Sequence, residues 1–78
     1  MNLSDEIAAR KRMLARIEES RANVKNKIVV ADKRRKANQI SLPDAHDHIA
    51  WCEQELARLS AAEKRIQSEL SAAKAALS

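Results

Sequence analysis

Apolar residues in the second half of the chain recur at alternating spacings of four and three. The positions are Ala45, Ile49, Cys52, Leu56, Leu59, Ile66, Leu70, Ala73 and Leu77. Such spacing is typical of a coiled-coil seam, the stripe of a helix that faces a partner helix at the a and d positions of a heptad. Glu63 interrupts the series where an apolar residue is expected. The pattern predicts a helix over residues 42–77 with one long apolar stripe.

The first half carries a less regular version of the same pattern. Its d positions are Leu3, Arg10, Ile17, Val24 and Ala31, and its a positions are Ile7, Leu14, Arg21, Ile28 and Arg35. Arg10 and Arg21 interrupt this seam. Asn2 or Ser4 can serve as the N-cap, and the acids Asp5 and Glu6 then fall in the first turn, where the helix dipole favours them. We expect a helix over about residues 3–38.

The connection between the two predicted helices is short, at about residues 39–42. Ser41, Leu42, Pro43 and Asp44 follow the order of an N-cap, two first-turn residues and an acidic N3 residue. Helices joined by so few residues lie antiparallel to each other. The chain has no Gly, and its only aromatic residue is Trp51, which disfavours a β fold. We therefore predict one all-α domain over residues 1–78, folded as an antiparallel two-helix hairpin.

The two largest interruptions of the seams are expected to meet. In an antiparallel pair, facing residues have numbers that sum to about twice the centre of the turn, which brings Arg21 within about one helical turn of Glu63. An acid–base pair inside a seam adds little net stability, but it penalises wrong registers. Arg21 and Glu63 are thus predicted to be a structural pair.

Small apolar residues flank the first seam, one position after each of its first four a residues. They are Ala8, Ala15, Ala22 and Val29. A chain of 78 residues buries too little surface for a large core, and its single cysteine cannot form an internal disulfide. We therefore expect this flank to be a dimer seam that joins two hairpins into a four-helix bundle. The lone cysteine and the lack of a signal peptide or membrane span favour a cytoplasmic protein.

Charge is distributed unevenly along the chain, whose net charge is +4. Residues 1–40 contain eleven Lys and Arg against five Asp and Glu, a net charge of +6, whereas residues 41–78 have four against six, a net charge of −2. The basic residues near the end of the first predicted helix are Lys25, Lys27, Lys33, Arg34, Arg35 and Lys36. They form a surface suited to nucleic acid, although the first helix has no aromatic residue for base stacking. Alternatively, the last four simply complement the helix dipole and the acids of the second helix.

Trp51 lies outside the predicted seam, about 130° from its centre if each residue turns the helix by 100°. A lone Trp in such a position is either an anchor for a second subunit or partner, or a local plug against Val30 or Leu42. We favour the anchor.

Candidate chemistry is sparse. Asp44, His48 and Cys52 are spaced four residues apart and share one helix face, which is compatible with a metal site. The alternative, which we favour, assigns Asp44 to the cap, His48 to the edge of the seam and Cys52 to the core. His48 and Cys52 have no third group or oxyanion donor to complete a catalytic site. We predict no enzymatic activity, no cofactor, no metal and no small-molecule substrate.

Part of the second half resembles a known family. The segment His46-Asp47-His48, followed by Cys52 and by Leu56-Ala57-Arg58, is similar to the second helix of the ROP-type RNA-binding proteins of plasmid copy control. Members of that family are two-helix hairpins that dimerise into four-helix bundles, which is what the resemblance implies for this chain. Their RNA-binding face includes an aromatic residue on the first helix, and this chain has none there.

The expected function is that of a non-enzymatic inhibitor or adaptor that binds another protein, in addition to forming a homodimer. Small basic helical hairpins are typical of phage and mobile-element proteins that inhibit a host component. The predicted contact residues are Trp51, Val30, Lys33, Arg34, Arg35 and Lys36. The alternatives are a ROP-like or non-specific nucleic-acid binder and a purely structural, self-associating coiled coil. No membrane partner is expected.

Overall fold

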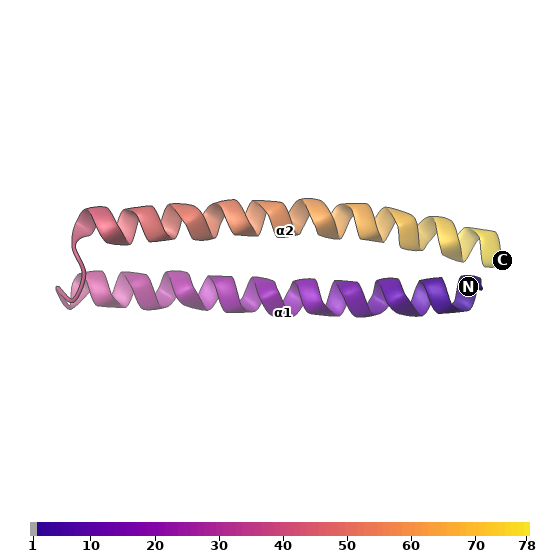
Figure 1. Ribbon diagram of the computed structural model, residues 1–78, viewed down its shortest axis with the longest axis horizontal. Coiled ribbons are helices and arrows are strands. Elements are labelled where there is room, and N and C mark those ends of the chain that lie inside the picture. The colour runs from indigo at the N-terminus through magenta and orange to yellow at the C-terminus, as the bar shows by residue number, and fades with distance from the viewer. Residues whose placement is uncertain (1) are drawn as a thin grey trace.

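The protein is a hairpin of two long helices. The computed structural model describes residues 2–78 and contains α1 (Leu3–Lys36) and α2 (Leu42–Leu77). Figure 1 shows the helices running antiparallel along their whole length, with both termini at one end and the connection at the other. The molecule measures 56 × 16 × 15 Å, and its radius of gyration is 17.5 Å, against roughly 11.5 Å for a compact globule of this length. The predicted all-α antiparallel hairpin is confirmed, and its shape is a rod.

Both helices begin with the caps that the sequence indicates. The Oδ1 atom of Asn2 accepts a hydrogen bond of 2.9 Å from the backbone N–H of Asp5. At the second helix, Ser41 Oγ accepts a bond of 3.2 Å from the N–H of Asp44. Pro43 lies in the first turn of α2, where its missing N–H would have had no partner within the helix. The start of α2 is therefore set by local chemistry.

The end of α1 differs from the prediction, because the helix stops at Lys36 and not at Asn38. Asn38 adopts a left-handed conformation with φ of 58°. Its N–H donates to the carbonyl of Arg35, at 3.1 Å, and the N–H of Gln39 donates to the carbonyl of Arg34, at 2.8 Å. This is the Schellman arrangement that commonly ends helices, with Asn in the position usually held by Gly. In a chain without Gly, Asn is among the few residues that adopt this conformation readily.

The buried core follows the predicted seams and is thin. Its members are Val24, Ala31, Ala45, Cys52, Ile66, Leu70 and Ala73, all at a or d positions. Four of them are Ala or Cys, so the hairpin buries few large apolar side chains. Leu77, also in the predicted seam, is exposed at the last position of α2. Within residues 2–78, neither helix contains an apolar stretch long enough to cross a membrane.

Two ion pairs join α1 to α2 and help to fix their register. Arg21 Nη2 lies 2.8 Å from Glu63 Oε2, so the structure brings the predicted pair together. The two side chains are 24% and 27% exposed, which gives a partly hydrated pair whose loss costs less than that of a fully buried one. The second seam arginine, Arg10, contacts Glu69 through Nε and Oε2 at 3.3 Å. Arg10 and Arg21, which interrupt the first seam, thus both pair with acids of α2.

The predicted dimer flank is uncovered in the single chain. Ala8, Ala15, Ala22 and Val29 are all exposed along α1. Their role in a four-helix bundle stays a prediction.

Candidate functional site

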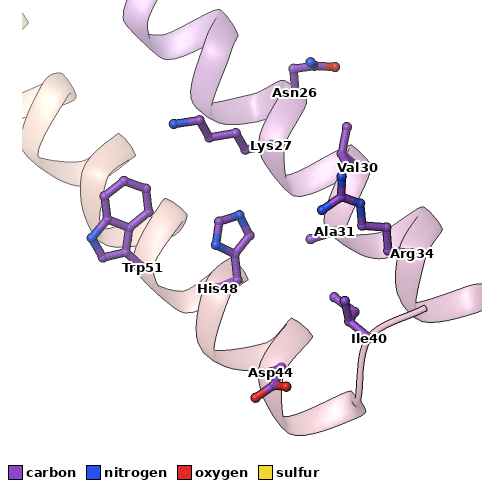
Figure 2. A pocket seen from close by; sticks show the side chains of 9 residues that line it. All are labelled: Asn26, Lys27, Val30, Ala31, Arg34, Ile40, Asp44, His48 and Trp51. Atoms are coloured by element: carbon purple, nitrogen blue, oxygen red, sulfur yellow. The ribbon is translucent and has the colours of Figure 1, made fainter. Parts of the chain in front are cut away.

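A groove of about 750 Å³ lies at the end of the rod where the helices are connected. Its lining comes from three parts of the chain, as Figure 2 shows. From α1 come Asn26, Lys27, Val30, Ala31 and Arg34, from the connection Ile40, and from α2 Asp44, His48 and Trp51. Lining residues at spacings of three and four on each helix lie on one helical face. Two adjacent helices and their connection therefore build the groove together.

Trp51 is the largest apolar side chain of this groove, and it is 48% exposed. Its ring stacks beside the imidazole of His48, with the ring centroids 6.3 Å apart and the planes 16° from parallel. Lys27 reaches across from α1 and places Nζ 5.7 Å from the centroid of the indole. A cation over an aromatic face is attracted by the ring quadrupole. These two contacts orient the ring, while half of its surface stays open to a ligand.

If Trp51 is a local plug at the end of the hairpin, it has to pack against Val30 or Leu42. Val30 lines the groove with Trp51 and is 37% exposed. Leu42 lies in a different hollow of about 500 Å³, which is lined by Arg35, Asn38, Gln39, Ile40, Ser41 and Leu42. Trp51 and Val30 therefore leave an open groove between α1 and α2.

The basic side chains of Lys33–Lys36, at the end of α1, do not lie together on one surface. Arg34 lines the groove, and Arg35 lines the second hollow. Arg35 and Lys36 bind the carboxylate of Asp32, at 2.9 and 3.0 Å. Hydrogen bonds from Arg35 and Lys36 lower the pKa of Asp32. Lys33, also exposed, lies in neither hollow among the residues described.

Several groove residues were absent from the contact set predicted by the sequence. They are Asn26, Lys27, Ala31, Ile40, Asp44 and His48. The antiparallel register contained a signal for Lys27, because residues 27 and 51 have numbers that sum to about twice the centre of the turn. Applied to Trp51, the rule that predicted the Arg21–Glu63 pair places Val30 opposite the indole and Lys27 within about one helical turn of it.

The residues considered as metal ligands have other roles. Cys52 is fully buried in the seam, and its Sγ lies 3.9 Å from Nε2 of His48. Asp44 belongs to the capped first turn of α2. Within residues 2–78, no three His, Cys, Asp or Glu side chains come together in a way that could hold a metal ion.

The groove combines features of a contact surface. Its features are a half-exposed indole, an apolar floor, two basic side chains from α1 and one acid from α2. Large apolar groups with a few convergent charges are typical of contact surfaces. No protein family, curated protein or solved structure matches the chain.

Proposed function

We propose that the protein is a non-enzymatic inhibitor or adaptor that binds another protein through the groove around Trp51. The observation that carries this proposal is the half-exposed indole next to the exposed Val30, in a groove bordered by Lys27 and Arg34. Trp is strongly enriched among the residues that dominate binding energies, especially where neighbouring groups exclude water from it. The rigid, capped helices on both sides hold the groove ready for a partner.

Nucleic acid is the second candidate, and one observation favours it. Trp51 of α2 lies beside Lys27, so the structure brings an aromatic ring to the basic helix that has none of its own. The charge in the groove argues against it, because Lys27 and Arg34 are opposed there by Asp44. Non-specific binding to phosphates usually depends on many cationic contacts. The protein partner is therefore the better-supported candidate.

Self-association is part of the proposal. The thin core and the exposed Ala8–Val29 flank support a dimer in which two hairpins cover each other's small residues. In a bundle built this way, the groove at the end of each hairpin stays available to a cytoplasmic partner.

The proposal predicts that partner capture depends on Trp51. Immobilised wild-type protein, Trp51→Ala and Leu77→Ala are exposed to extract of the source cell, and captured proteins are quantified. Loss of a Trp anchor costs about 2 kcal/mol or more, so Trp51→Ala should weaken capture at least about 30-fold. Leu77, which is 56% exposed at the opposite end of the rod, provides a matched control that should behave like wild type.

A salt series and a nuclease treatment in the same experiment distinguish a nucleic-acid partner from a protein partner. Binding to phosphates should weaken by orders of magnitude between about 50 and 200 mM salt and disappear after nuclease treatment. Capture of a protein through Trp51 should survive nuclease. A partner retained equally by Trp51→Ala, or one lost with the nucleic acid, would refute the proposal.

A further inference from the structure

The groove around Trp51 has walls of opposite charge. On α1, Lys27 and Arg34 border it, and among residues 2–78 neither side chain forms an ion pair. On α2, Asp44 borders the opposite side (Figure 2). The apolar groups between the walls belong to Val30, Ala31, Ile40 and Trp51. The groove is therefore cationic along one edge, apolar in the middle and acidic at one point of the other edge.

The two cations have a defined spacing. Lys27 and Arg34 are seven residues apart, which places them on the same stripe of α1 at a separation of about 10.5 Å along the helix axis. Val30 falls between them, and both side chains line the same groove as Trp51. A ligand that followed this edge would meet the two positive charges two helical turns apart.

We propose that the groove binds one amphipathic, acidic helix of the partner protein. The apolar face of that helix covers Val30, Ile40 and Trp51, and carboxylates seven residues apart on one edge of it pair with Lys27 and Arg34. This inference rests on the proposed function and adds the chemical class of the partner.

A helix fits this groove better than an extended strand does. The backbone groups of α1 and α2 are hydrogen-bonded within the helices, so the hairpin offers no open sheet edge to a strand. The groove lies between two antiparallel helices, where a third helix can pack its side-chain ridges against theirs. Two to three turns of ligand are enough to span about 10.5 Å between the cations.

Because Lys27 contacts Trp51, a ligand that covers Trp51 needs acidic residues of its own. Because Nζ of Lys27 lies 5.7 Å from the indole centroid, a ligand that covers the indole also removes water from the ammonium group. A desolvated charge without a partner opposes binding strongly. Carboxylates of the ligand on the α1 edge remove this cost, whereas Asp44 disfavours them on the α2 edge. The orientation of the ligand is therefore set by charge.

A library of displayed helical peptides tests this inference. Full-length wild-type protein serves as the target, and enriched peptides are measured against Lys27→Glu/Arg34→Glu and against Lys11→Glu/Arg12→Glu. The control pair reverses two exposed cations of the same helix outside the groove. Circular dichroism establishes that both variants keep their helices.

Enriched peptides should carry two acids seven residues apart beside an apolar face. Reversal at Lys27 and Arg34 should weaken binding at least 30-fold, and reversal at Lys11 and Arg12 should leave it within about 2-fold. Replacing the two peptide acids with Lys should restore binding to Lys27→Glu/Arg34→Glu, which a merely misfolded variant could not show.

Several results would overturn the inference. The library could yield no enriched peptides, or enriched peptides that lack the two acids. The Lys27→Glu/Arg34→Glu variant could bind the peptides as tightly as wild type does. A single-stranded oligonucleotide could compete with the peptides and bind more tightly than they do. Loss of self-association in Lys27→Glu/Arg34→Glu would likewise assign the groove to a second copy of the chain. A cellular partner whose binding needs Trp51 but neither Lys27 nor Arg34 would refute the acidic helix as the ligand. The proposed function would still stand.

Discussion

An Ile66→Ala variant is expected to lose about 2–5 kcal/mol of unfolding free energy, the range for truncating a buried isoleucine. Ile66 is only 2% exposed and is one of the few large side chains in a core made mostly of Ala and Cys. Domains of this length have a total stability of roughly 4–12 kcal/mol. The substitution should therefore remove a large share of it, as measured by urea unfolding followed by circular dichroism at one fixed protein concentration.

Leu77→Ala is the control for this result. Leu77 continues the same heptad series in the sequence, but it is exposed at the end of α2. Its truncation should change the unfolding free energy by no more than about 0.5 kcal/mol. Equal losses in the two variants would mean that the seam of the hairpin does not dominate its stability.

An Ala15→Glu variant is expected to weaken the proposed dimer at least about 100-fold. Ala15 lies in the middle of the exposed flank of small residues, where a second hairpin would approach closely. A carboxylate buried at that contact without a partner costs several kcal/mol. Sedimentation equilibrium should show a dimer for wild type at micromolar concentration and a monomer for the variant.

Ala61→Glu controls for the added charge and for the lower helix propensity of Glu. Ala61 is exposed on the side of α2 that faces away from the seam, and this variant should dimerise like wild type. A monomeric wild type would contradict the dimer itself. Equal dissociation of the two variants would move the dimer contact away from the Ala8–Val29 flank.

The sequence was sufficient for the fold because its heptads and caps are local signals. The a and d positions predicted the buried residues, and Ser41 with Pro43 predicted the start of α2. The end of α1 was placed too late because Asn is compatible with a helix, and only the backbone shows that Asn38 is left-handed. The antiparallel register about the turn predicted Arg21 near Glu63, whereas Glu69, the partner of Arg10, lies beside the seam and was missed.

The candidate site was predicted only in part. Trp51 and Val30 were recognised as apolar residues outside the seam, and both line the groove. The run Lys33–Lys36 was treated as one cluster, although successive helical residues point about 100° apart. Asp32 binds two of these side chains, and only Arg34 reaches the groove. The approach of Lys27 to Trp51 depends on two helices together, which a pattern along one helix does not reveal.

Photo-crosslinking in the source cell tests most directly whether the groove contacts another protein. A benzophenone amino acid is incorporated in place of Val30, inside the groove, and in a second variant in place of Leu77, at the opposite end of the rod. We predict that position 30 crosslinks to a partner protein of distinct mass and that position 77 does not. Identical products from both positions, no product from position 30, or crosslinks to nucleic acid alone would contradict the account.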